Sequence, residues 1–286
     1  MIRAAAPAST ANLGPGFDAA GAALELWNEV EAEEGAFGVE VEGEGAGELP
    51  RDERHLSLQA FAAFAPVAGY RFRFVNRIPL ERGLGSSAAA IALGLVAGAR
   101  AAGASPSGDE LLALAGRFEA HFDNLAAALF GGVCVAWQEG GRPRARRIAD
   151  DVPAAALAVV PPGRMSTEAS RGALPESVSH ADAAATAGAA LLLGAALGSG
   201  DPSLLAPGLR DRLHEPYRSA GAPLLERVRA LAPPGLLGVT LSGSGPTVIA
   251  WVDRASSDNA AALLRSSLES EADVLPLAVA QRGALG

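Results

Sequence analysis

Residues 79–89 read Pro79-Leu80-Glu81-Arg82-Gly83-Leu84-Gly85-Ser86-Ser87-Ala88-Ala89, and an alanine-rich stretch follows them. Glycine allows the backbone to approach a ligand closely, and the first N–H groups of a helix have no partner within that helix. The positive end of the helix dipole favours an anion at the same point. This stretch therefore predicts a turn that binds phosphate, followed by a helix from about Ser87 to Ala102.

The candidate phosphate loop differs from a Walker loop, which needs a lysine before its Ser or Thr. The chain contains no lysine at all. Backbone amides, hydroxyl groups, arginine and a metal ion would have to hold the phosphates instead. Gly-Ser runs also end strands and cap helices without any ligand, so residues 79–89 taken alone leave a purely structural turn open.

Two further segments favour the functional interpretation. Residues 7–18 read Pro-Ala-Ser-Thr-Ala-Asn-Leu-Gly-Pro-Gly-Phe-Asp, and residues 241–247 read Leu-Ser-Gly-Ser-Gly-Pro-Thr. Together with residues 79–89, they resemble the signature of the GHMP kinases, small-molecule kinases named for galactose, homoserine, mevalonate and phosphomevalonate.

The first of these segments looks like the homoserine kinase branch of that family. Three more segments fall in the order and spacing of the same branch: 119–124 (Glu-Ala-His-Phe-Asp-Asn), 166–171 (Ser-Thr-Glu-Ala-Ser-Arg) and 214–218 (His-Glu-Pro-Tyr-Arg). The resemblance extends from about residue 2 to about residue 252. Six ordered motifs are difficult to obtain by chance.

The resemblance implies an α+β protein with the two-domain GHMP kinase fold. A ribosomal-S5-like N-terminal domain would bind the nucleotide, and a ferredoxin-like C-terminal domain would complete the substrate site between the two. The chain turns polar at Asp150 and Asp151 and meets Pro153, which places the expected boundary between domains at 1–150 and 151–286.

Periodicity gives the expected elements. In the first half we predict strands near 24–32, 37–41, 70–74 and 132–137, and helices near 58–65, 87–102 and 107–118. In the second half, strands at 155–161, 236–242, 247–253 and 273–280 with a helix at 256–269 give the β-α-β-β-α-β order of a ferredoxin-like domain, with extra helices inserted.

The resemblance also implies which residues bind ATP and Mg²⁺. Ser86 and Ser87 would lie beside the β- and γ-phosphates and the metal. The family usually has a metal-binding glutamate eleven residues before Asn124, where this chain has Ala113. Glu110, one helical turn earlier, is predicted to reach the metal instead. The full set of predicted nucleotide-binding residues is Pro79, Arg82, Gly83, Leu84, Gly85, Ser86, Ser87, Ala88 and Ala89.

A homoserine site needs partners for an ammonium, a carboxylate and a hydroxyl group. By resemblance, Asp18 would take the ammonium, and Arg171 and Arg218 would take the carboxylate by forked hydrogen bonds, with Gly243 also in contact with substrate. The catalytic set would be Asn12 and Asn124, which orient the hydroxyl, with His121 alongside. A side-chain amide cannot accept the hydroxyl proton, so we expect transfer to phosphate or water.

Several alternatives remain at this level. Asp18 could merely cap a turn, and each arginine could be a solvated surface charge. The enzyme could act on another small alcohol such as mevalonate, or the chain could be a non-catalytic sensor of metabolite and nucleotide, for which Ala113 is the main support. The role of His55 is open.

Composition excludes other classes of protein. The chain has 286 residues, 49% of them hydrophobic and 19% charged, and a formal net charge of −9. Nucleic-acid binding needs clustered positive charge, and the one basic run, at 142–147, is predicted to be an exposed strand or turn. The apolar stretch at 183–197 is too short to span a bilayer and is predicted to be a buried helix. We expect neither a nucleic-acid partner nor membrane attachment.

The remaining features point to a reducing compartment. The single cysteine, Cys134, cannot form an internal disulfide and is flanked by valines that predict a buried strand. The first motif follows the initial Met-Ile-Arg closely, which leaves no space for a signal peptide. We expect a cytoplasmic protein and, because dimers are common among the relatives, a homodimer.

Overall fold

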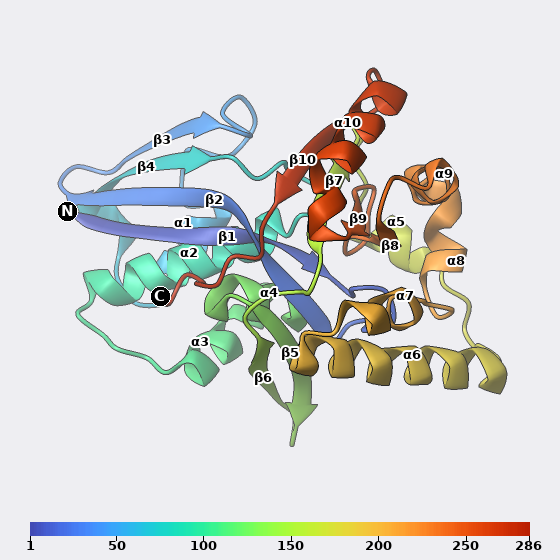
Figure 1. Cartoon of the computed structure of the whole chain (residues 1–286). Helices are drawn as coiled ribbons and strands as arrows, with labels where there is room; N and C mark the ends of the chain where they lie inside the picture. The colour runs from blue at the N-terminus through green and yellow to red at the C-terminus, as the bar shows by residue number, and fades with distance from the viewer.

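The computed structural model describes all 286 residues and contains two sheets, one from each half of the chain (Figure 1). The first sheet has the order β3-β4-β2-β5-β6, with β1 paired to β2, and only the β3–β4 pair is parallel. The four strands predicted in this half are confirmed, because they overlap β2, β3, β4 and β5. The strands are β1 (Ile2–Ala11), β2 (Ala20–Glu34), β3 (Gly38–Gly43), β4 (Tyr70–Asn76), β5 (Val133–Glu139) and β6 (Arg142–Ala149).

Four helices pack in the first half of the chain: α1 (Leu56–Phe61), α2 (Ser86–Ala101), α3 (Gly108–Ala115) and α4 (Phe122–Phe130). The central helix, α2, is buried almost throughout between Ala88 and Ala99. Its alanine, glycine and aliphatic side chains let α1, α4 and β1 pack closely around it. This tight packing fixes the position of the N-terminus of α2, where the phosphate loop ends.

The second sheet is antiparallel with the order β10-β7-β9-β8. It confirms the predicted ferredoxin-like order, with α9 (Leu224–Leu231) and α10 (Ser257–Leu268) adjoining it (Figure 1). The connection from β7 to β8 carries the inserted helices α5 (Thr167–Gly172), α6 (His180–Ser199), α7 (Leu205–Gly208) and α8 (Glu215–Arg218). The strands are β7 (Ala155–Val160), β8 (Leu236–Leu241), β9 (Val248–Val252) and β10 (Asp273–Leu277).

The last residues of the chain return to the first half of the protein. After β10, the N–H of Ala280 donates to the carbonyl of Ala23 (3.0 Å), and the N–H of Ala284 donates to the carbonyl of Ala128 (2.8 Å). Figure 1 shows this tail returning to the first half of the protein, where the N–H of Leu285 also donates to the carbonyl of Leu129 in α4 at 3.2 Å. We retain 1–150 and 151–286 as proposed domain bounds, with the tail as a segment of the second domain that packs on the first.

The prediction of a buried helix at 183–197 was wrong. The helix, α6, has the length and apolar composition of a membrane span, yet only 28% of its most apolar window is buried. Thr186, Ala189, Leu193, Ala196 and Leu197 face the protein, whereas Leu191 is 78% exposed. Alanine explains the error, because hydropathy counts it as apolar although its single methyl exposes little area.

Candidate functional site

A cavity of about 240 Å³ lies where the two halves of the protein meet, and all six sequence motifs contribute to its wall. Residues 12–18 come from the turn between β1 and β2, and residues 81–88 from the loop that starts α2. The 119–124 segment opens α4, while α5, α8 and the 243–245 turn close the cavity from the second half.

The phosphate loop presents unpartnered amides to this cavity. The first intrahelical bond of α2 runs from Ala89 N–H to Gly85 C=O at 2.9 Å, so the N–H groups of the preceding three residues have no intrahelical acceptor. Gly85 has φ +67°, and a Cβ there would lie 2.0 Å from Ser9 Oγ. Glycine is therefore required, and the exposed donors favour an anion beside Ser86 and Ser87.

The other half of the chain clamps the same loop. A Cβ on Gly83, where φ is +79°, would lie 2.4 Å from the carbonyl oxygen of Ser242. The Ser242 hydroxyl donates to the Gly83 carbonyl at 2.6 Å. The anion-binding loop is thus held between β1 on one side and the 242–245 turn on the other.

Four of the predicted nucleotide-binding residues do not line the cavity. Leu84 and Ala89 are fully buried in the hydrophobic core. Arg82 instead donates to the carbonyl of Pro162 at 3.0 Å and approaches Glu44 at 3.9 Å. Pro79 lies before the loop. These side chains shape or anchor the loop, whereas Gly83, Gly85, Ser86, Ser87 and Ala88 lie at the cavity wall.

Arg171, on α5, contacts two of the predicted site residues, Asp18 and His121. Its Nη2 lies 2.7 Å from Asp18 Oδ1 and its Nη1 lies 3.1 Å from Asp18 Oδ2. Its Nε donates to His121 Nε2 at 3.1 Å. Since a guanidinium only donates, His121 carries its proton on Nδ1, which donates to Glu119 Oε1 at 2.5 Å. That bond raises the pKa of His121.

Arg218, at the end of α8, is 4% exposed, yet it lines the cavity. Its Nη1 donates to the carbonyl of Gly243 at 3.3 Å, while its buried Nε has no hydrogen-bond partner. Its guanidinium carbon lies 5.1 Å from the centre of the Phe17 ring. Burial lowers the pKa of Arg218. A buried guanidinium without a carboxylate partner favours an anionic ligand.

The side-chain amides of Asn12 and Asn124 differ in how much hydrogen-bonding capacity they retain for a ligand. Asn12 donates to the Gly243 carbonyl at 3.0 Å, and its Oδ1 accepts from the Asp18 N–H at 3.0 Å. Both of its polar atoms therefore hold the 12–18 turn, which contains non-glycine residues at positive φ. In Asn124, Oδ1 accepts from Ser9 Oγ at 2.8 Å, while Nδ2 has only a long 3.4 Å contact with Asp123. The Asn124 amide retains donor capacity toward a ligand.

The structure does not bring Glu110 to the cavity. Its carboxylate accepts from the N–H and hydroxyl of Ser107, at 2.7 and 2.8 Å, in a capping box at the start of α3. The metal role predicted for Glu110 is therefore corrected. Glu119, in the 119–124 motif, does line the cavity together with Ser86 and Ser87.

Asp123 is a second carboxylate to which the sequence reasoning gave no role. It lines the cavity and is 3% exposed, and its Oδ1 accepts the Asn124 N–H at 2.7 Å. Burial raises the pKa of Asp123 to about 6. Glu119 and Asp123 both lie in a motif that the sequence already singled out, so its position along the chain was the available signal.

A smaller cavity of about 80 Å³ adjoins Ser86 and Ser87 on the side of α1. His55 lies at its wall, stacked on Phe74 with ring centres 4.4 Å apart. Its Nδ1 accepts the Ser57 N–H and caps α1, while its buried Nε2 has no partner. Burial lowers the pKa of His55 to about 4, so the ring is neutral.

Known families match both halves of the chain. The model described as "GHMP kinases N terminal domain" matches residues 55–132, and "GHMP kinases C terminal" matches residues 190–270. The chain is 43% identical to a homoserine kinase of Streptomyces avermitilis over 97% of this chain and 96% of that protein. It is 42% identical to a homoserine kinase of Streptomyces coelicolor over 98% and 96%.

Solved structures of homoserine kinases are similar to this chain over almost its whole length. A homoserine kinase from Cytophaga hutchinsonii superposes with a TM-score of 0.86 at 26% identity, covering 99% of this chain and 96% of that one. A putative homoserine kinase from Listeria monocytogenes gives 0.83 at 30% identity, covering 99% and 98%. A mevalonate kinase of L. major, at 0.73 and 15% identity over 98% and 96%, shares the fold.

Proposed function

Since this chain belongs to the GHMP kinases and, among them, to the homoserine kinases, we propose that it transfers the γ-phosphoryl group of ATP to the side-chain hydroxyl of L-homoserine. The product, O-phospho-L-homoserine, would serve threonine biosynthesis. One observation supports this function above the others. The opposed Asp18 and Arg171 charges, the buried Arg218 and the N-terminus of α2 all face a single cavity.

Amino-acid recognition would use the charges of that cavity. A homoserine zwitterion carries one ammonium and one carboxylate, which Asp18 and Arg218 complement. Arg171 already pairs with Asp18 and would turn part of its fork to the substrate carboxylate. Both arginines approach Phe17, with their guanidinium carbons 5.8 and 5.1 Å from its ring centre, and this contact would help to hold them in place.

The phosphates of ATP would lie on the N–H groups at the start of α2 and on the hydroxyls of Ser86 and Ser87. The adenosine part would extend toward the smaller cavity beside His55, where apolar side chains and one free ring nitrogen are available. This arrangement would direct the γ-phosphate into the larger cavity, toward the amino acid.

Mg²⁺ fits the donors at this site. The protein has no cluster of three or more His, Cys, Asp or Glu side chains that could hold a metal without help. Mg²⁺ usually takes one or two carboxylates and fills its other positions with phosphate oxygens and water. Glu119 and the hydroxyls of Ser86 and Ser87 would hold it. When bound, the ion neutralises charge on the phosphates.

Transfer would consist mainly of positioning. The homoserine oxygen forms a bond to the γ-phosphorus while the bond to the β,γ-bridging oxygen breaks, and ADP leaves with that electron pair. Asn124 Nδ2 would orient the hydroxyl by donating to its oxygen. Neither Asn12 nor Asn124 can accept the hydroxyl proton, which would pass to a phosphate oxygen or to water.

The alternative functions have less support. Mevalonate carries a carboxylate and no ammonium, so it would leave Asp18 without a cation. A non-catalytic sensor was suggested by Ala113, but Glu119 supplies a carboxylate at the cavity wall. We further propose that the protein is cytoplasmic, because its single cysteine suits a reducing compartment, and that its net charge of −9 disfavours nucleic acid. We propose no membrane attachment, since one face of the apolar helix α6 packs on the protein, and a homodimer, because dimers are common among the relatives.

The test is ADP release by the purified protein with ATP and Mg²⁺ in the presence of homoserine, mevalonate or no acceptor. The proposed function predicts release that depends on homoserine. Release with mevalonate instead would identify another alcohol kinase. Binding of both ligands without release would identify a sensor.

A further inference from the structure

His214 is a buried histidine that the transfer reaction does not use. It opens α8 and is fully inaccessible to solvent. Its ring stacks on Phe17, with centres 4.9 Å apart and planes inclined by 20°. Its two nitrogens contact different halves of the protein, Nε2 lying 2.8 Å from the carbonyl oxygen of Gly14 and Nδ1 lying 3.4 Å from Arg218 Nη1.

These two contacts require the same form of the ring. A carbonyl oxygen only accepts, so Nε2 must carry the proton that is donated to Gly14. A guanidinium only donates, so Nδ1 must offer its lone pair to Arg218. Both requirements are met by the neutral ring protonated on Nε2, and burial lowers the pKa of His214 in the same sense. The ring therefore bridges its two partners in one protonation state.

The two partners of His214 belong to opposite sides of the proposed amino-acid site. Gly14 belongs to the turn that presents Asp18, the proposed ammonium partner. A Cβ on Gly14, where φ is +78°, would lie 2.4 Å from the carbonyl oxygen of Leu209, so this turn fits tightly against the second half of the chain. Arg218 is the proposed carboxylate partner. The imidazole of His214 spans the two.

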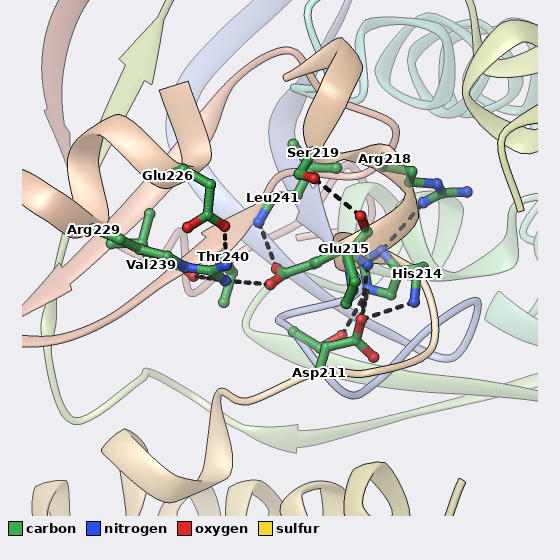
Figure 2. Close-up of polar contacts among 12 residues, drawn as sticks. Asp211, His214, Glu215, Arg218, Ser219, Glu226, Arg229, Val239, Thr240 and Leu241 are labelled. Atoms are coloured by element: carbon green, nitrogen blue, oxygen red, sulfur yellow. Dashed lines mark hydrogen bonds and ion pairs between the residues drawn. The ribbon is translucent and has the colours of Figure 1, made fainter. Parts of the chain in front are cut away.

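The backbone that carries His214 is held from the side of the second domain (Figure 2), and the buried Asp211 carboxylate lies 3.7 Å from Nε2 of the ring. The carboxylate of Asp211 accepts the backbone N–H groups of Leu213, His214 and Glu215 at 2.8 to 3.0 Å. Glu215, 1% exposed, accepts from the Leu241 N–H at 2.8 Å and from Arg229 Nη2 at 2.5 Å. The bond from Leu241 to Glu215 joins α8 to the end of β8, and Asp211 orders the turn before α8, so the backbone at His214 has a defined position relative to the sheet.

We propose that His214 is a positioning residue that sets the separation between Asp18 and Arg218, and thereby matches the site to an α-amino acid that carries both charges. This inference rests on the proposed function. A ligand with one charge needs only one of the two partners in place, whereas a zwitterion needs both at the correct spacing. The contribution of His214 should therefore be specific to acceptors that carry both groups.

The experiment compares the wild type with His214→Ala and His214→Gln. Gln can donate to the Gly14 oxygen and accept from Arg218, so it should restore much of the function. Thr186→Val is the matched control. The Thr186 hydroxyl is buried and accepts the backbone N–H of Arg212, two residues before His214, at 3.1 Å, but it forms no hydrogen bond with Gly14 or Arg218. The readouts are KM for homoserine, KM for ATP, and the inhibition constants of 3-aminopropan-1-ol and 4-hydroxybutanoate.

We expect His214→Ala to raise KM for homoserine about tenfold or more, since it removes the 2.8 Å hydrogen bond to Gly14 and the longer 3.4 Å contact with Arg218. KM for ATP and both inhibition constants should stay within about twofold, because each inhibitor carries one charge. His214→Gln should lie between Ala and the wild type, and Thr186→Val should leave KM for homoserine unchanged. If His214→Ala does not fold, His214→Asn, whose shorter side chain cannot reach Gly14, takes its place.

An unchanged KM for homoserine in the Ala or Asn variant would overturn the inference. So would an equal loss for homoserine and both single-charge inhibitors, since that pattern indicates general loosening of the site. A wild-type protein that does not phosphorylate homoserine would instead refute the proposed function, and the inference would fall with it.

Discussion

Arg171 and Asp18 form a bidentate ion pair across the boundary between the two halves of the chain, with Nη2 2.7 Å from Oδ1 and Nη1 3.1 Å from Oδ2. Both side chains remain well exposed, at 39% and 44%. An ion pair of this exposure contributes little to stability. Its position at the cavity wall instead places one negative and one positive group where an amino acid presents the opposite charges.

Asp18→Asn should raise KM for homoserine far more than KM for ATP, because it removes the charge partner of the ammonium and touches no phosphate. A charged hydrogen bond is worth about 1.5 to 3 kcal/mol, which corresponds to roughly ten- to over a hundredfold in affinity. Steady-state kinetics with each substrate varied in turn provides the measurement. Equal changes in both KM values would remove Asp18 from the ammonium site.

Arg171→Lys should also weaken homoserine binding, although the positive charge is kept. A lysine ammonium cannot reproduce the planar fork that engages Asp18 while its Nε donates to His121. The same kinetic assay measures the effect, and the thermal midpoint should change little because the ion pair is exposed. Wild-type KM for homoserine in this variant would move the carboxylate site elsewhere.

Glu119→Gln should raise the Mg²⁺ concentration needed for half-maximal activity, since the proposed metal site loses its carboxylate. Glu110→Gln is the matched control: it is the same substitution nine residues earlier, in a capping box outside the cavity. That control should lower the thermal midpoint and leave the Mg²⁺ requirement unchanged. The reverse pattern would restore the metal role originally predicted for Glu110.

Asp123 should give kcat/KM for homoserine a pH dependence near 6. As pH falls through about 6, the buried carboxyl becomes neutral, and the cavity attracts the substrate ammonium less, so kcat/KM should fall. The effect on stability has the opposite sign: a carboxyl with a raised pKa in the folded state binds protons more readily than in the unfolded chain, so its contribution to stability is greatest at low pH and is lost as pH rises from about 4 to 6.

In Asp123→Asn, the amide oxygen still accepts the Asn124 N–H, but the titration is removed. The decrease in kcat/KM near pH 6 should therefore disappear, and so should the loss of stability between about pH 4 and 6. A pH profile that keeps the same midpoint would assign the titration to His121, the other group of the cavity with a raised pKa.

Sequence reasoning predicted much of the fold because hydrophobic periodicity reflects burial. Buried and more exposed residues alternate in β4 and in residues 28–33 of β2, and the buried residues of α10 follow a helical period. β1 was not predicted, since residues 6–11 are all buried and show no alternation. α4 was also not predicted, because residues 125–129 are all apolar and buried and therefore show no helical alternation of polar and apolar positions.

The site could be predicted only at the level of segments. The order of the motifs indicated which loops would meet. Which side chains bind each other depends on where each side chain points in the folded protein. Sequence assigned Asp18 and Arg171 to different substrate groups, whereas they also bind each other. The family spacing of eleven residues led from Asn124 to Ala113, and helical spacing led from there to Glu110, which lies on the same helix, α3. The carboxylate that lines the cavity, Glu119, lies instead in the connection between α3 and α4, where neither spacing applies.

The most direct test of the proposed activity is ³¹P NMR of the product made from ATP and L-homoserine by the purified protein with Mg²⁺. Transfer to the side-chain hydroxyl predicts ADP and an equal amount of a phosphomonoester whose phosphorus couples to the two protons of the adjacent methylene group. An acyl phosphate, a phosphoramidate, or ATP left intact in the presence of homoserine would contradict the account.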